Sequence, residues 1–131
     1  MTTFHQAMTA FWSQFFADGA PIPAYIAGMV PSGASFPYIT YDVSINPAFS
    51  SGLSIAHVWL RRENGESPIP KCAAILDSIA QAIPDAGVRV PVGKGCVVLY
   101  RNDASWQSYV QDPENPEVLG GRISYQINYY L

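Results

Sequence analysis

The C-terminal segment of this chain alternates between two kinds of side chain. Apolar and aromatic residues occupy every second position of 122–131, RISYQINYYL: Ile123, Tyr125, Ile127, Tyr129 and Leu131. The positions between them are mostly polar: Arg122, Ser124, Gln126, Asn128 and Tyr130. Because successive side chains of a strand point to opposite faces, this pattern predicts a β-strand with one face in the core. The chain must therefore build a sheet and cover one side of it.

Two earlier segments have the same period. In 36–45, FPYITYDVSI, one set of positions points toward the predicted core: Ile39, Tyr41, Val43 and Ile45. In 53–63, LSIAHVWLRRE, the corresponding positions are Ala56, Val58 and Leu60. The short connection predicts an antiparallel pair. Pro37 lacks an N–H donor, so it belongs at the beginning of its strand or at an edge.

A hairpin is predicted over 88–101, VRVPVGKGCVVLYR, with its turn at Gly93-Lys94-Gly95. Pro91 makes the first arm of this hairpin an edge strand. Residues 102–117, NDASWQSYVQDPENPE, are then expected to form a long loop that carries Trp106 and Tyr109. Loops of this length in compact domains are often functional. The two rings either make a binding contact or fold back over the core.

Two amphipathic helices are predicted. In 4–16 the apolar positions recur at helical spacing: Phe4, Met8, Phe11, Trp12 and Phe15. In 64–84 we expect Ser67 as N-cap and Pro68 at the first helical position, with Pro84 as the stop. The apolar stripe of this second helix is Cys72, Ile75, Leu76, Ile79 and Ile83. Residues 20–35, rich in Pro, Gly and Ala, are expected to form an irregular connector.

This order of elements predicts one domain, 1–131, of the α+β class. We expect a mostly antiparallel sheet of about five strands with both helices packed on one face, since two helices cannot cover both. The other face would carry a mixture of polar and aromatic side chains: Tyr38, Thr40, Trp59, Arg61 and Tyr130. Such a face suits contact with a neighbour better than open water.

The low content of charged residues also favours a surface that contacts a neighbour. Charged residues make up 13% of the chain, about half of the ~25% that is usual for a globular domain. The deficit suggests a surface covered by copies of the chain or by a partner; the alternative is a surface kept soluble by Ser, Asn, Gln and Thr. The net charge is −3, and Arg61-Arg62 is the only basic cluster in the sequence. Both observations argue against a surface that binds the phosphates of a nucleic acid. No apolar run is long enough to predict a membrane span, and the N-terminal residues MTTFHQAM do not predict a secretory signal. We therefore expect a cytosolic location, in which Cys72 and Cys96 are reduced.

No pattern predicts catalysis, a cofactor or a metal site. His5 and His57 are isolated on a helix and a strand, and neither cysteine has a neighbouring activator. Gly93-Lys94-Gly95 lies between strands rather than before a helix, which favours a turn over a phosphate loop. The acidic side chains of 112–117 are interrupted by prolines, which breaks the oxygen spacing of a calcium loop.

Several segments together carry a family resemblance: FWSQF, FPYITY, VWLR, VRVPVGKGCVVLYR, SWQSYVQD and GRISYQINYY. In their order and spacing, over nearly the whole chain, they resemble the tail-terminator, or tail-completion, proteins of long-tailed bacteriophages and prophages, which include minor structural proteins. The resemblance implies an α+β subunit, not an enzyme, that assembles into a ring, usually a hexamer. The ring caps the tail tube, stops its growth and docks onto the head connector.

The implied partners are other copies of the chain, the tail-tube protein and the head-connector protein, in the virion and in the host cytoplasm during assembly. DNA would only pass through the ring, and no membrane is involved. We take Arg61, Arg62, Trp106 and Tyr109 as candidate interface residues. Two alternatives remain open. One is a small ligand-binding or enzyme domain with a pocket under 102–117, and the other is a different connector or tail-tube subunit of the virion.

Overall fold

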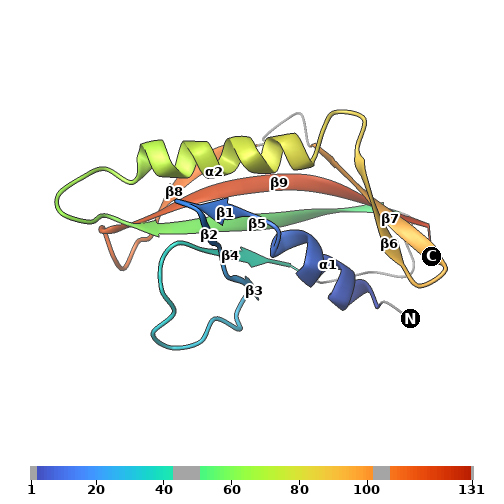
Figure 1. Cartoon of the computed structure of the whole chain (residues 1–131), viewed down its shortest axis with the longest axis horizontal. Helices are drawn as coiled ribbons and strands as arrows, with labels where there is room; N and C mark the ends of the chain where they lie inside the picture. Colours follow the sequence, from blue (N-terminus) through green and yellow to red (C-terminus); the bar gives the residue numbers. More distant parts are fainter. Residues whose placement is uncertain (1–2, 43–50, 102–106, 131) are drawn as a thin grey trace.

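The computed structural model describes residues 3–42, 51–101 and 107–130. It is an α+β domain in which helices lie against a long, curled sheet (Figure 1). The helices are α1 (Phe4–Trp12) and α2 (Ile69–Ala82). The main sheet contains β3 (Ala24–Ile26), β4 (Tyr38–Tyr41), β5 (Ser51–Arg61), β6 (Val88–Val92), β7 (Gly95–Arg101), β8 (Gln107–Gln111) and β9 (Val118–Tyr130). A separate small hairpin consists of β1 (Phe16–Ala17) and β2 (Ala20–Pro21).

Strand β9 lies at the centre of the sheet. The strand order is β3-β4-β5-β9-β7-β6, and within the described parts of the chain only the β3–β4 pair is parallel. One edge of β9 pairs with β5 along almost its whole length. The other edge is shared: β7 pairs with its C-terminal half and β8 with its N-terminal half. The long alternating strand therefore organises the sheet, as its pattern predicts.

The predicted core positions are confirmed for the strands that the structure describes, except for Tyr129, which is only partly buried. Ile123, Tyr125 and Ile127 of β9 are buried, as are Ile39 and Tyr41 of β4. On β5, Ala56, Val58 and Leu60 are buried and the residues between them are more exposed. The 88–101 hairpin is also confirmed, with Val92 paired to Gly95 and β6 at the end of the strand order, as Pro91 predicts. Positions 43–50 and 131 lie outside the described residues.

The sheet is larger than predicted, because the described residues form seven of its strands rather than about five. The extra strands lie in segments that we expected to be irregular. Ala24–Ile26, within the 20–35 connector, pairs with β4, and Gln107–Gln111, within the expected 102–117 loop, pairs with β9. Both are too short to show alternation, and each pairs because a longer strand leaves backbone groups open beside it.

The helix boundaries also need correction. Helix α1 ends at Trp12, although Phe15 beyond it is still buried. Its N-terminus is held by a capping box between Thr3 and Gln6. For α2, the N-cap position is Pro68 and not Ser67; the Ser67 hydroxyl instead accepts a 3.3 Å hydrogen bond from the Ile69 N–H. In the part of the chain that the structure describes, no helix is long and apolar enough to cross a membrane.

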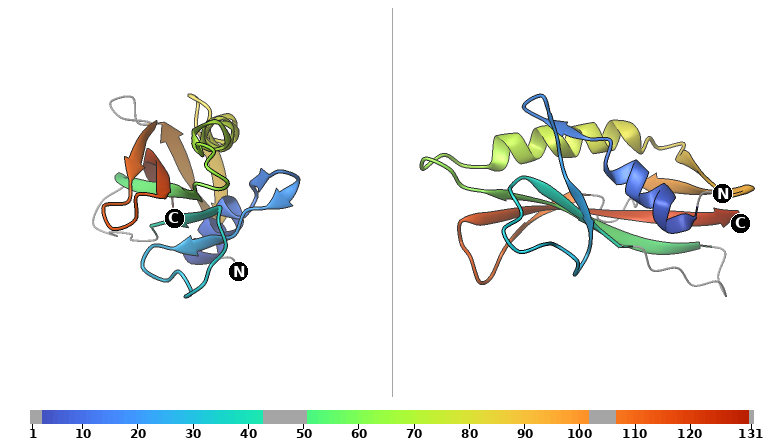
Figure 2. Two further views of the ribbon diagram at one scale, coloured as in Figure 1. Left: turned by 90° about the vertical axis from the view of Figure 1, so that its left-hand side faces the viewer. Right: turned by 60° about the horizontal axis from the view of Figure 1, so that its bottom comes forward.

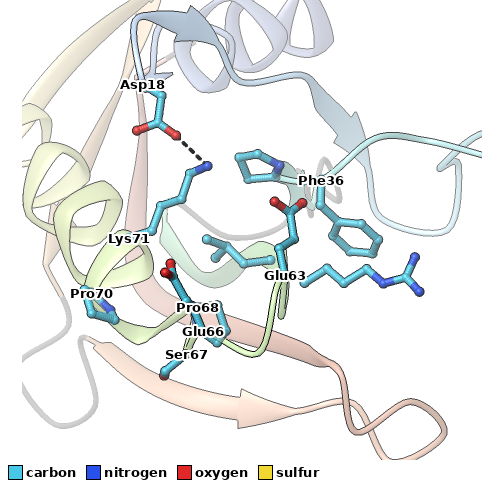
Figure 3. A pocket seen from close by; sticks show the side chains of 11 residues that line it. Asp18, Phe36, Glu63, Glu66, Ser67, Pro68, Pro70 and Lys71 are labelled. Carbon is cyan, nitrogen blue, oxygen red and sulfur yellow. Dashed lines mark ion pairs between the residues drawn. The ribbon is translucent and has the colours of Figure 1, made fainter.

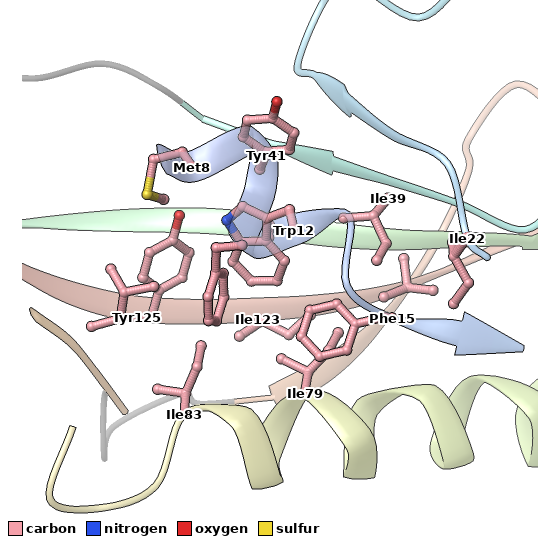
Figure 4. Packing of buried hydrophobic residues seen from close by; sticks show 14 of the residues in the cluster. Met8, Trp12, Phe15, Ile22, Ile39, Tyr41, Ile79, Ile83, Ile123 and Tyr125 are labelled. Atoms are coloured by element: carbon pink, nitrogen blue, oxygen red, sulfur yellow. The ribbon is translucent and has the colours of Figure 1, made fainter. Parts of the chain in front are cut away.

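Trp12 lies in the middle of the core (Figure 4). Its ring is 5.5 Å from that of Tyr125 and stacks on Tyr41 at 6.5 Å. Ile79, near the C-terminal end of α2, and Ile83, its C-cap residue, approach the same cluster. Both helices therefore bury their apolar residues against the same side of the sheet, and Figure 2 shows the curl of the sheet around them.

Candidate functional site

The opposite side of the sheet carries the mixed surface that the sequence predicts. We call it the outer face, and it includes the side chains of Tyr38, Thr40, His57, Trp59 and Arg122. Tyr38 pairs with Trp59 and Thr40 with His57 between β4 and β5, and His57 pairs with Arg122 of β9. These neighbours therefore share one face of the sheet. Aromatic, polar and basic groups lie side by side there.

Trp59 is fixed by contacts with three strands. Its indole Nε1 donates a 3.0 Å hydrogen bond to the Thr40 hydroxyl, and its ring stacks on His57 with centroids 5.0 Å apart. Gly120 of β9 is its cross-strand partner, and a Cβ at Gly120 would lie 2.8 Å from Cζ3 of the indole. The glycine thus leaves the space that the indole occupies on the sheet.

Beside Trp59 is a cavity of about 460 Å³, which we call the outer groove. Tyr38, Thr40, His57 and Trp59 line it from the sheet. The segment before β4 contributes Ala27, Gly28, Val30 and Phe36, and the β8–β9 end contributes Asp112, Asn115 and Val118. Its lining thus combines aromatic rings with the Asp112 carboxylate, the Asn115 amide and the Thr40 hydroxyl.

Two titratable groups of the outer groove, His57 and Tyr38, favour their neutral forms. Burial, and secondly the charge of Arg122, lowers the pKa of His57. Burial, and then Asp112 and Tyr25, raises the pKa of Tyr38. At neutral pH the groove therefore presents a neutral imidazole and a protonated phenol.

A second cleft, of about 370 Å³, lies at the N-terminal end of α2 (Figure 3). Lys71 Nζ and Asp18 Oδ2 form an ion pair of 2.7 Å at its margin, and Glu63 and Glu66 add carboxylates. Neither histidine nor cysteine lines it. Among the described residues, no three His, Cys, Asp or Glu side chains gather closely enough to hold a metal ion.

The remaining reactive residue types lie apart from one another. His5 is exposed on α1, while Cys72 is buried on α2 against Gly121 of the sheet. Burial raises the pKa of the Cys72 thiol to about 11, which leaves little thiolate at neutral pH. Cys96 lies on β7, where it pairs with Pro91 and Tyr130. These positions bring no nucleophile next to a base.

The structure separates the predicted interface residues. Arg61 is exposed at the end of β5, where it contributes to the cleft of Figure 3. Arg62 forms an ion pair with Glu117, with 3.8 Å between Nε and Oε2. The backbone N–H of Arg62 also donates a 2.7 Å hydrogen bond to the Glu117 carbonyl. Trp106 lies outside the described residues. Arg61 and Arg62 thus lie together at one end of the sheet.

Tyr109 lies elsewhere, on β8, and its side chain is 49% exposed. It pairs with Gly121, where a Cβ would meet Cys72 of α2, so Tyr109 is on the helix-bearing side of the sheet. Tyr109 and the outer-face residues therefore do not form one patch. The sequence did not indicate the outer groove, because part of its wall comes from the segments 20–35 and 102–117, which we expected to be irregular. The feature of the sequence that could have indicated the groove is the placement of Tyr38 and Trp59 on the same predicted face of the sheet.

No protein-family model and no curated protein matches this sequence.

Proposed function

We propose that this chain is a structural subunit of a long-tailed bacteriophage or prophage, a tail terminator that assembles into a ring on the tail tube. The observation that carries the proposal is the one-sided sheet. The helices bury one face, while the outer face presents Tyr38, His57 and Trp59 beside the outer groove. A mixed aromatic and polar surface of this kind is typical of protein interfaces. The resemblance of the segment order to the tail-terminator family supports the same role.

In this role the chain would bind other copies of itself in a hexameric ring, the tail-tube protein on one side and the head connector on the other. A net charge of −3 suits a ring through which DNA passes without adhering. The separation of the reactive side chains supports an assembly role rather than an enzymatic one. A different connector or tail-tube subunit of the virion would share this sheet-based assembly.

The test is the solution mass of the purified chain, measured by light scattering over a concentration series with negative-stain images of the same samples. A closed ring is the expected result. When tail tubes are added to the sample, the ring should bind to one end of each tube, and the tubes should stop elongating. A chain that stays monomeric throughout and does not bind tail tubes would overturn the proposal.

The outer groove favours a second candidate, a small ligand-binding domain. Its aromatic faces and the Asp112 carboxylate suit a cationic group. Arginine amide is a suitable probe, followed through the indole N–H signals in NMR spectra. A saturable shift of the signal that Trp59→Leu removes would support this function. A spectrum unchanged by the probe would remove it.

A further inference from the structure

Strand β8 has one edge that pairs with β9 and one that faces away. The Asp112 N–H donates to the Val118 carbonyl at 3.2 Å, directly after the last pair of the β8–β9 ladder. Backbone groups in an antiparallel strand alternate between its two sides. Ser108 and Val110 therefore direct their N–H and C=O groups toward β9, and those of Gln107, Tyr109 and Gln111 point outward. None of the described residues forms a strand on that outer side.

The edge strand β6 is protected against added strands. Val92 pairs with Gly95 across the tight turn, so Val88, Val90 and Val92 direct their backbone groups toward β7. The outward positions are Arg89 and Pro91. Proline has no N–H to donate, and a charged side chain at the edge disfavours pairing with another sheet. An incoming strand would find only the Arg89 N–H as a donor.

The edge strand β3 is protected by its length. It spans Ala24–Ile26, and the bonds from the Ile39 N–H to Pro23 O and from the Ala27 N–H to Tyr41 O fix its alternation. Only Ala24 and Ile26 then direct backbone groups outward. Very short edge strands are a common device against edge-to-edge association.

Strand β8 has none of these protections. Its sequence, Gln107–Gln111 or QSYVQ, contains no proline and no charged residue. Beside it on the helix-bearing side, Tyr109 and Ile69 are each 49% exposed. A cavity of about 200 Å³, lined by Ile69, Gln111 and Leu119 among others, lies between the start of α2 and this strand. An open ladder next to apolar surface is a template for an additional strand.

We propose that the outer edge of β8 receives an extended segment from a second copy of this chain and that this strand addition joins neighbouring subunits. The inference rests on the proposed self-assembly and names its contact. A second copy fits this edge because the five residues of β8 carry no charge, and contacts between identical subunits are depleted in charged residues. The added strand would pair with Gln107, Tyr109 and Gln111 and place a side chain in the cavity beside Ile69.

The test compares two substitutions of the same residue. Tyr109→Pro and Tyr109→Ala both remove the phenol side chain. Only proline also removes the backbone N–H that points away from β9. Because that N–H does not pair with β9, proline is tolerated there as in other edge strands. Light scattering should show that Tyr109→Pro raises the concentration for half-assembly at least about tenfold above that of Tyr109→Ala, equal to about 1.4 kcal/mol. Arg89→Pro, at an outward position of β6, is the matched control and should assemble like the wild type.

The outcomes separate this inference from the proposed function. A ring that Tyr109→Pro disrupts more than Tyr109→Ala supports both. If the subunit ring is equally stable in the two variants, the proposed function is retained and the strand addition is overturned. A two-fold dimer that Tyr109→Pro dissociates supports the edge contact, through two antiparallel β8 strands, and overturns the ring. A wild-type monomer at all concentrations overturns the edge contact. If Tyr109→Pro does not fold, amide exchange decides: wild-type Tyr109 and Gln111 must gain protection on assembly, and unchanged exchange overturns the inference.

Discussion

The indole of Trp59 and the hydroxyl of Thr40 are joined by a hydrogen bond of 3.0 Å that crosses from β5 to β4 on the outer face. The bond is diagonal, since Thr40 pairs directly with His57. Thr40 is only 7% exposed, so few water molecules can replace it as a partner. One hydroxyl thus fixes the largest ring of the outer groove.

Thr40→Val should lower the free energy of unfolding by about 1–3 kcal/mol, because it keeps the shape of the side chain and leaves the indole N–H without its acceptor. Thr40→Ser keeps the hydroxyl and is the matched control, with a smaller expected loss. Urea denaturation of the three proteins measures the difference. Equal stability of the valine and serine variants would show that the bond contributes nothing to folding.

Gly121 is required by the packing of α2 on the sheet. A Cβ at this position would lie 2.7 Å from Cys72 Sγ and 3.1 Å from Leu76 Cδ2. Gly121→Ala should therefore cost about 1–3 kcal/mol of stability, as is usual for overpacking in a core. At Gly52 of β5 a Cβ would meet only Tyr129 Oη at 3.5 Å, so Gly52→Ala is the control and should change little.

The same contact predicts coupling between Gly121 and Cys72. Cys72→Ala removes the sulfur that the new Cβ would strike, so the double variant should lose less stability than the sum of the two single variants. The rescue is partial, since Leu76 remains close. Denaturation of the four proteins of the cycle gives the coupling energy. Strictly additive losses would mean that α2 lies farther from β9 than the structure shows.

Arg101 of β7 holds the C-terminal end of α2. Its Nε donates to Ile83 O at 2.7 Å and its Nη2 to Ala80 O at 2.6 Å, which satisfies carbonyls left open at the helix end. Arg101→Met should cost about 1–3 kcal/mol. The Asp85 side chain that pairs with Arg101 is 89% exposed, so Asp85→Asn should cost less than about 0.5 kcal/mol. Thermal unfolding measures both, and a similar loss in the two variants would assign the effect to the ion pair instead.

His57 predicts a pH dependence of stability. Its pKa is lowered in the folded state, by burial and then by Arg122, from about 6.5 in the unfolded chain. Above that pH the imidazole is neutral in both states and contributes no pH dependence. As the pH falls below about 6.5, the unfolded chain binds a proton that the folded chain takes up only at lower pH. The free energy of unfolding should therefore fall through this window.

The measurement is the difference in unfolding free energy between about pH 7.5 and about pH 5.5, the window on either side of the unfolded pKa. His57→Asn should show a smaller difference than the wild type. Arg122→Gln, which removes the second cause of the lowered pKa, should give an intermediate value. An identical pH dependence in wild type and His57→Asn would contradict the burial of this imidazole against Trp59.

Much of the core could be read from the chain. Ile123, Tyr125 and Ile127 are buried because alternation along an extended strand fixes which side chains share a face. The spacing of Met8, Phe11 and Trp12 likewise fixed the buried side of α1. Pro91 indicated the edge position of β6, since a residue without an N–H cannot sit in the middle of a ladder. Each of these follows from the geometry of a single element.

The sites depend on the tertiary structure. Nothing in Gln107–Gln111 alternates strongly enough to predict a strand; it pairs because β9 extends beyond the end of β7 and leaves its backbone groups open. The outer groove likewise needs Phe36 and Asp112, from segments far apart in the chain, to reach the same side of Trp59. The sequence by itself determined which faces are apolar, because that periodicity is local. Only the assembled sheet decided which edge stays open and where the groove lies, because both depend on where neighbouring strands end.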